Sequence, residues 1–179
     1  MRKLIVAFLA LSCIISCKSK EKTASGEETN NNVVADANFT LDPANTYVLI
    51  AGVLTWKDPN MNPFNNTHRK DEELYNLFVR KGVKKDNIIY LQDSEATNAN
   101  MQSRLKELLE RAEPNSTFIF YYAGHGAREG NGPMSFANYD YSAGNAFEAS
   151  LLTKEINSLF KGKQVLLLAD CCYSGALME

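Results

Sequence analysis

FIFYY at 118–122 leads into AGHG at 123–126, and VLLLA at 165–169 leads into DCCYSG at 170–175; these two stretches decide the fold. Each apolar run has the length and composition of a strand buried on both faces, as in a parallel sheet covered by helices. Parallel strands end at the same edge of a sheet, and open α/β sheets bind ligands at that carboxyl edge. The sequence therefore predicts that the two motifs lie together at a binding site.

The two motifs carry the residues of a thiol nucleophile and its proton-transfer partner. Cys172 is the candidate nucleophile and His125 the candidate acid, which would protonate the leaving amine in acyl transfer. A thiol attacks as the thiolate, which a nearby imidazole or a helix N-terminus stabilises, and the residues after Cys172 are expected to begin such a helix. The backbone N–H groups of Gly126 and Cys172 are the candidate oxyanion hole.

The rest of the chain alternates strands and helices. Strands are predicted at 47–51, 87–91, 117–122 and 164–169. The first helix is expected to start at Asp71 and end by Gly82, and the second to be capped by Asn98 or Asn100. After His125 a long, polar loop rich in Gly, Asn and Ser is expected to run to Ala149, and loops of this length are usually functional or mobile. A third, short helix is expected to follow, with Thr153 as its cap. This order predicts a three-layer α/β/α sandwich with a mostly parallel sheet of about four strands.

Composition excludes several other classes. The 179 residues include 19 basic and 21 acidic ones, a net charge of −2, which argues against a nucleic-acid partner. The cysteines at 13, 17, 171 and 172 form no CxxC pair, and His68 and His125 are the only histidines that could serve as further ligands. No structural metal site is therefore expected. No cofactor is expected, and no carboxylate loop of recognisable spacing indicates whether calcium activates the protein.

The N-terminus has the pattern of a signal segment. Basic residues precede a short apolar stretch, and residues 14–17, IISC, resemble a bacterial lipobox in which Cys17 is lipidated. The prediction is a signal peptide at 1–16, a polar tether at 17–44 and a folded domain at 45–179. The protein would be secreted across the inner membrane and held by acyl chains on a bacterial membrane surface. An ordinary secretory signal is the alternative.

The motifs YYAGHG at 121–126 and DCCYSG at 170–175 resemble those of the caspase-like cysteine peptidases, in particular the bacterial caspase-family and metacaspase branch. The separation of His125 and Cys172 is 172 − 125 = 47 residues, near the roughly 50 typical of caspases. The resemblance implies peptide or protein substrates and a thioester intermediate. It also implies that Asp170, two residues before the nucleophile, lines a pocket for a basic residue, and that Asp71 is a second, less clearly aligned acid of that pocket.

Several alternatives remain at this level. The legumain-like peptidases share the architecture and a Cys-x-Ser-Gly motif, and an inactive surface-tethered binding module has the same fold. The resembled family continues with two more strands, whereas this sequence ends 179 − 172 = 7 residues after Cys172. The fourth strand is therefore expected to be an edge, unless a second copy or a small-subunit partner completes the sheet. Cys171 reads as a small buried side chain, His68 as a surface histidine, and Asp71 equally well as a helix N-terminal acid.

Overall fold

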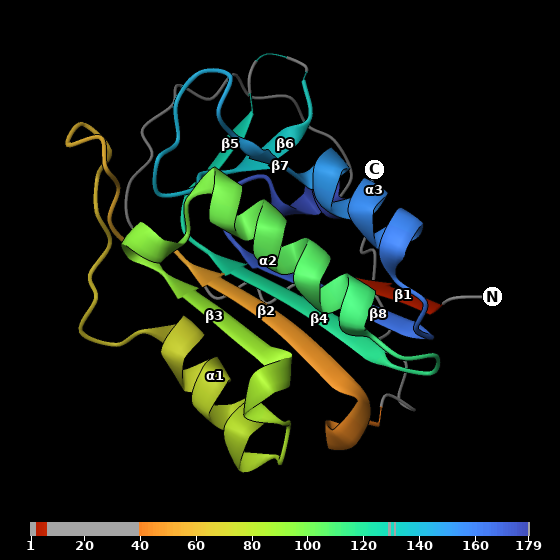
Figure 1. The fold of residues 1–179 in the computed structure, drawn as a ribbon. Coiled ribbons are helices and arrows are strands. Elements are labelled where there is room, and N and C mark those ends of the chain that lie inside the picture. Colours follow the sequence, from red (N-terminus) through yellow and green to blue (C-terminus); the bar gives the residue numbers. More distant parts are fainter. Residues whose placement is uncertain (1–2, 7–39, 129, 131, 179) are drawn as a thin grey trace, which may run out of the picture.

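A five-stranded parallel sheet forms the centre of the protein, with helices on both faces (Figure 1). The structure, a computed structural model, describes residues 3–6 and 40–178 with the exception of 129 and 131. The strand order is β1-β8-β4-β2-β3 and every pairing is parallel. The strands span β1 Lys3–Val6, β2 Thr46–Gly52, β3 Ile88–Gln92, β4 Thr117–Ala123 and β8 Gln164–Asp170. This is the α/β sandwich that the sequence predicted.

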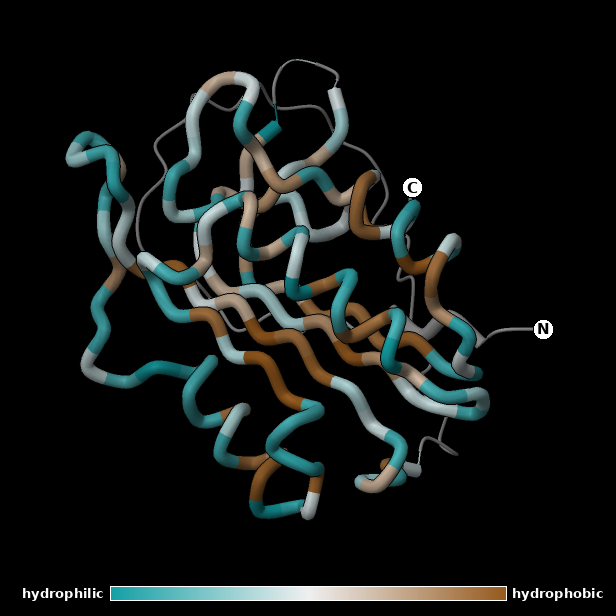
Figure 2. Tube along the Cα trace, in the orientation of Figure 1, coloured by the Kyte–Doolittle hydropathy of each residue, from teal (hydrophilic) through white to brown (hydrophobic). Residues whose placement is uncertain are grey.

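The helices divide between the two faces of the sheet. Helix α1 spans Lys70–Arg80 and packs on one face, where Phe78 joins Val48, Ile50 and Tyr121 in a buried cluster. The other face is covered by α2, Asn98–Arg111, and α3, Ala149–Leu159. All seven residues of β2 and all seven of β4 are buried. Figure 2 shows hydrophobic stretches along the inner strands, whereas the helices alternate between hydrophobic and hydrophilic residues.

The stretch after His125 is more ordered than the predicted loop. It forms a small antiparallel sheet of three short strands, β5 Gly126–Arg128, β6 Met134–Phe136 and β7 Phe147–Glu148. Phe136 and Phe147 pack against Phe120 of β4 and are fully buried. The sequence prediction was wrong here because two- and three-residue strands are too short to show a period.

Three helix starts also differ from the sequence predictions. Helix α1 begins at Lys70 rather than Asp71. Helix α2 is capped by Thr97, whose hydroxyl accepts from the amide of Asn100, rather than by an asparagine. Helix α3 starts at Ala149, so that Thr153 lies within it and its hydroxyl donates back to the carbonyl of Ala149. Short 3-10 segments complete the chain: η1 Pro43–Asn45, η2 Lys85–Asn87, η3 Asp93–Glu95 and η4 Ser174–Met178.

The outer side of β8 is not an open edge in the structure. Lys3–Val6, which the sequence assigns to the signal peptide, pairs with β8 from Gln164 to Leu167 as the fifth strand. The lipidation candidate Cys17 and most of the proposed tether lie outside the described residues. Of the helices that the structure describes, none has the length and apolar content to cross a membrane.

Candidate active site at the carboxyl edge of the sheet

The two sequence motifs emerge side by side, because β4 and β8 are neighbours in the sheet. Ala123 and Asp170 are opposite each other in the register, and the amide of Gly124 donates to the carbonyl of Asp170 at 3.3 Å. Two residues further on, Gly126 lies so close to the Cys172 backbone that a Cβ at 126 would overlap the Cys172 carbonyl. A glycine at 126 is thus what allows the histidine and cysteine segments to meet.

The two adjacent cysteines have different surroundings. Cys172 is exposed, whereas Cys171 is half-buried and packs against the core. Burial, together with the charges of Cys172 and Asp170, raises the pKa of Cys171 to about 12. Cys171 is therefore a protonated thiol near neutral pH, and the accessible sulfur of the pair belongs to Cys172.

The segment after Cys172 is not the helix that the sequence led us to expect. Tyr173 has a positive φ of 63° and is followed by the short 3-10 segment η4. An α-helix N-terminus therefore does not face the sulfur. The segment is held instead by Leu177, which is buried in the main core beside Met134 and Phe136 of β6.

His125 is held between two aromatic rings from the loop that follows β2. The centroid of its ring lies 4.5 Å from that of Trp56 and 4.4 Å from that of Phe64. Its Nε2 is 2.9 Å from the carbonyl oxygen of Asn62. A carbonyl only accepts hydrogen bonds, so Nε2 carries the proton of the neutral ring and Nδ1 keeps the lone pair. Such a tautomer leaves Nδ1 able to accept a proton from a thiol.

The backbone around His125 is also fixed. The buried Tyr122 hydroxyl lies 2.9 Å from the carbonyl oxygens of both His125 and Ala137, and the amide of Ala137 donates to the His125 carbonyl at 2.9 Å. His125 and Ala137 form a hydrogen-bonded pair of an antiparallel ladder, in which hydrogen-bonded and non-hydrogen-bonded pairs alternate. The next pair, Gly126 with Phe136, is therefore not hydrogen-bonded. The N–H of Gly126 is therefore turned away from β6. This geometry suits the oxyanion-hole role predicted from the sequence.

Asp170 ends β8 on the face of the sheet that carries α1. Alternate residues of a strand share a face, and Leu166 and Leu168 belong to the cluster on that face. Asp170 lines a cleft of about 560 Å³ beside α1, together with Glu73, Leu77 and Tyr121. No hydrogen bond or salt bridge joins its carboxylate to another described residue, and burial raises its pKa.

Asp71 lies on the same face but is buried and already paired. Its Oδ2 accepts from Arg69 at 2.8 Å and from the hydroxyl of Tyr90 at 2.8 Å, and its side chain is 1% exposed. The carboxylate reaches this place because residue 52 is glycine: a Cβ there would overlap Oδ2. Its other oxygen, Oδ1, is buried with no donor among the described residues.

The carboxylates of Asp170 and Asp71 are both close enough to Tyr121 to affect its hydroxyl. Burial is the main cause that raises the pKa of the Tyr121 hydroxyl, and the charges of Asp170 and Asp71 add to it. Gly52, Ala123 and Asp170 occupy one row across β2, β4 and β8, so the small side chain of Ala123 separates the two acidic positions. The structure thus brings Asp71 and Asp170 to the same end of the same face.

Arg69 and Asp93 are site residues that sequence reasoning missed. Arg69 is 7% exposed and its guanidinium binds Asp71, the carbonyl of Gly52 at 3.0 Å and Asp93 at 2.7 Å. Burial lowers the pKa of Arg69, but the hydrogen bonds and charges of Asp71 and Asp93 outweigh it and raise the pKa above its usual value. An arginine next to a helix start gives no sign of burial, because two of its three partners come from β2 and from the segment after β3.

Trp56 and Phe64 were also missed. They lie in or next to a stretch that is predicted to be an irregular polar loop. The sequence does not indicate which side chain an aromatic residue of a loop packs against. The only available signal was the presence of two large apolar rings where solvent-exposed residues are expected. By contrast, His68 is exposed, as the sequence indicated.

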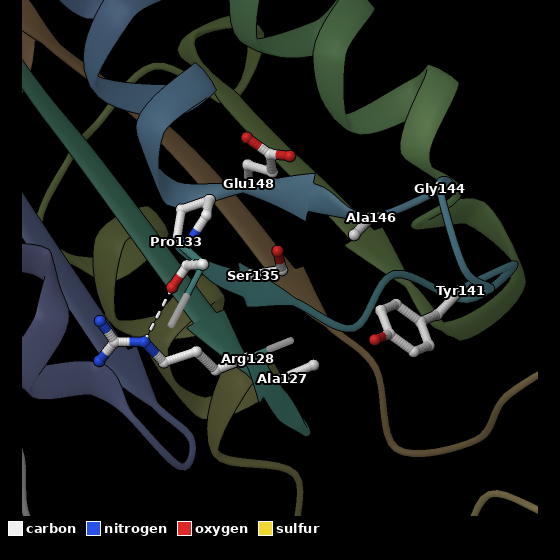
Figure 3. Close-up of a pocket in the computed structure, with 9 residues that line it drawn as sticks. Ala127, Arg128, Pro133, Ser135, Tyr141, Gly144, Ala146 and Glu148 are labelled. Carbon is white, nitrogen blue, oxygen red and sulfur yellow. Dashed lines mark hydrogen bonds between the residues drawn. The ribbon is translucent and has the colours of Figure 1, made fainter. Parts of the chain in front are cut away.

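A second, smaller pocket lies on the three-stranded sheet and is separate from this site (Figure 3). Its volume is about 240 Å³ and it is lined by Ala127, Ser135 and Glu148 from the three strands. These residues share one row of the sheet, whereas Phe136 and Phe147 of the other row face the core. The pocket therefore opens away from the core side, where η4 packs. Nowhere among the described residues do three or more His, Cys, Asp or Glu side chains group as metal ligands.

Comparisons with known proteins agree with this arrangement. Residues 64–179 match the family model described as metacaspase, peptidase C14 domain. The chain is 26% identical over 137 residues to Metacaspase-1 of Candida albicans, covering 65% of this chain and 30% of that protein. It is 29% identical over 118 residues to Metacaspase-9 of Arabidopsis thaliana, covering 58% of this chain and 35% of that protein. The chain therefore spans about a third of the length of these relatives.

Among solved structures, a protein of Geobacter sulfurreducens has a similar fold, with a TM-score of 0.59 at 18% identity, covering 72% of this chain and 50% of that one. At this identity the likeness concerns the fold alone. The family model, in contrast, covers both motifs and both acidic positions, from Asp71 to Cys172. On this evidence the chain belongs to the metacaspase family of peptidases, the caspase-like cysteine peptidases of the C14 type.

Proposed function

We propose that the protein is a cysteine endopeptidase in which Cys172 and His125 form the catalytic dyad. The observation that carries this proposal is the meeting of the two motifs at neighbouring strand ends, with Gly126 against the Cys172 backbone. The exposure of Cys172 and the lone pair that the neutral tautomer leaves on Nδ1 of His125 support the same roles. The substrate is a peptide or protein that reaches the carboxyl edge of the sheet.

In the proposed reaction, Nδ1 of His125 takes the proton of the Cys172 thiol, and the sulfur attacks the carbonyl carbon of the scissile bond. The N–H groups of Gly126 and Cys172 bind the oxyanion of the tetrahedral intermediate. His125 then gives its proton to the leaving amine as the C–N bond breaks, leaving a thioester on Cys172. Water, deprotonated by His125, hydrolyses the thioester and restores the thiol. The chemistry requires no cofactor.

We propose further that the residue before the cleaved bond is arginine or lysine. Asp170 is a half-buried carboxylate that forms no salt bridge with another described residue, although Lys70 and Arg80 line the same cleft, so a bound guanidinium or ammonium would give it a direct partner. Asp71 contributes less charge because Arg69 already balances it, but its buried Oδ1 is an unfilled acceptor. Glu73 also lines the cleft, but its carboxylate is already paired with Lys70.

The decisive experiment compares peptides that end in Arg, Lys, Asn or Asp before a fluorogenic group. Wild type is expected to cleave the Arg and Lys peptides, Cys172→Ala to cleave none, and the matched control Cys171→Ala to retain cleavage. Equal rates for wild type and Cys172→Ala would remove the peptidase assignment. Preference for Asn would indicate a legumain-like specificity instead, and preference for Asp would exclude the basic pocket.

The raised pKa of Asp170 gives this specificity a pH dependence. Because burial raises its pKa, the carboxylate that pairs with a basic residue is lost at a higher pH than for an exposed aspartate. We expect kcat/KM for the Arg peptide to fall as the pH falls through that pKa. Asp170→Asn is expected to cleave the Arg peptide more slowly and without this acidic limb. An unchanged profile in Asp170→Asn would rule out Asp170 as the pairing group.

We propose that a lipid on Cys17 holds the domain on a bacterial membrane surface after export. The support is the sequence alone, in which polar residues follow the lipobox-like IISC directly. Cells grown with radioactive palmitate are expected to label the wild-type protein and not Cys17→Ala. Labelling of both would refute the assignment.

A further inference from the structure

A buried group of charges lies next to the loop that holds His125. The group consists of Arg69, Asp71 and Asp93, which we call the ion cluster. Neither Arg69 nor Asp93 touches the cysteine motif in the hydrogen bonds of the described residues. The mechanism above gives them no part, although burying such charges is unfavourable unless each is paired.

Asp93 connects the ion cluster to the loop between β2 and α1. Its Oδ1 accepts from the amides of Leu54, at 2.8 Å, and Thr55, at 3.1 Å. Its Oδ2 binds Arg69 at 2.7 Å. The carboxylate thus fixes the two residues that precede Trp56, while Arg69 fixes the carboxylate.

The same loop supplies the two aromatic rings and the hydrogen-bond partner that hold the His125 ring. Trp56 and Phe64 lie on the ring, and the carbonyl of Asn62 binds Nε2. The two ends of the loop are tied together, because the amide of Phe64 donates to the carbonyl of Leu54 at 2.9 Å. Any shift of Leu54 is therefore passed to both the Trp56 and the Phe64 side of the ring.

We propose that the ion cluster is a positioning element for His125, acting through the loop at 53–64. Arg69 holds Asp93, and Asp93 holds the amides of Leu54 and Thr55. The loop then holds the imidazole between its two aromatic rings. This inference rests on the proposed catalytic role of His125, but the placement of the ring can be measured without any activity.

The geometry at Asp93 offers a matched pair of substitutions. Asp93 has a φ of 46°, a left-handed conformation that glycine and asparagine both tolerate. Asp93→Gly keeps the backbone and removes the acceptor, whereas Asp93→Asn keeps an oxygen that can accept from Leu54 and Thr55. Glu107→Gln, in an exposed salt bridge of α2, is the control for a loss of charge.

The first readout is the proton NMR spectrum of the histidine rings. The chain has two histidines, and only His125 has aromatic rings against it among the described residues, so ring currents displace its signals. Asp93→Gly is expected to move the His125 signals toward those of an exposed histidine, with Asp93→Asn and Glu107→Gln close to wild type. The emission of Trp56, the chain's single tryptophan, is expected to shift to the red in Asp93→Gly only.

The second readout is peptide cleavage. Asp93→Gly is expected to lower kcat by tenfold to a hundredfold, on the order expected for a catalytic group displaced by about 1 Å, with KM nearly unchanged. Asp93→Asn is expected to restore most of kcat. Arg69→Lys, which keeps a charge but loses the planar guanidinium, provides a second variant and is expected to shift the His125 signals as well.

Folded Asp93→Gly or Arg69→Lys protein with wild-type His125 signals would overturn the proposal. The proposal would also be overturned if kcat falls in Asp93→Gly and Asp93→Asn does not restore it. If wild type cleaves no peptide, the proposed function fails, and the NMR comparison still decides whether the ion cluster positions His125.

Discussion

Alkylation of the two adjacent cysteines tests the site without any assumption about activity. Cys171 has a pKa raised to about 12 by burial and by the charges of Cys172 and Asp170. At pH 8 its thiolate fraction is therefore about 10⁻⁴, whereas a thiol with the reference pKa of about 8.5 is about one quarter thiolate. The thiolate is the reactive form, so Cys171 is expected to react about a thousandfold more slowly than such a reference thiol.

The assay is iodoacetamide labelling at pH 8 followed by mass spectrometry of the peptide that starts at Gln164. Almost all label on this peptide is expected on Cys172, and Cys172→Ser is expected to remove it, whereas Cys171→Ser should not. In guanidinium chloride the two cysteines are expected to react at similar rates, because unfolding removes the burial. Labelling of Cys171 within tenfold of Cys172 in the folded protein would refute the reasoning.

Three further predictions concern packing and charge. Gly126→Ala is expected to lower kcat/KM on the order of a hundredfold with little change in melting temperature, because its Cβ displaces the Cys172 carbonyl; unchanged peptide cleavage would contradict the close approach. Arg69→Ala is expected to lower the free energy of unfolding in urea by about 3–5 kcal/mol, since it leaves buried carboxylates unpaired. Lys70→Ala, which breaks an exposed pair, should change it by less than about 1 kcal/mol; equal effects would argue against the buried pairing. Burial acts to raise the pKa of Asp140, but its hydrogen bonds outweigh burial, so the pKa in the folded protein is lowered. The ionised carboxylate therefore stabilises the folded protein above the ordinary aspartate pKa, and this stabilisation is lost as the pH falls through the lowered pKa. Acid unfolding is expected to be less steep in Asp140→Asn, and identical curves would refute this.

Much of the fold could be predicted because the composition of each apolar run is enough to indicate a buried strand. The strands at 46–52, 117–123 and 164–170 are recognisable from composition, and parallel pairing follows from the helices between them. The same reasoning placed His125 and Cys172 at one edge of the sheet. It failed for the small sheet at 126–148, whose strands are stabilised by Phe136 and Phe147 in the core and not by a local pattern.

The site was predicted less completely than the fold. Asp170 and Asp71 were candidates from the sequence, which did not show how they differ. Asp170 forms no salt bridge with another described residue, whereas Asp71 is bound by Arg69. The helix expected after Cys172 is a short 3-10 segment, because Leu177 turns the chain back into the core.

By itself, the sequence determined the order of the four central strands and the three helices, the two motifs and the edge of the sheet where they end, because hydrophobic periodicity is a local property. Only the tertiary structure decided what surrounds those motifs. The rings that hold His125, the carboxylates bound to Arg69 and the contact of Gly126 with Cys172 all join residues far apart in the chain. Such contacts depend on how the loops pack over the finished sheet, and no single segment encodes them.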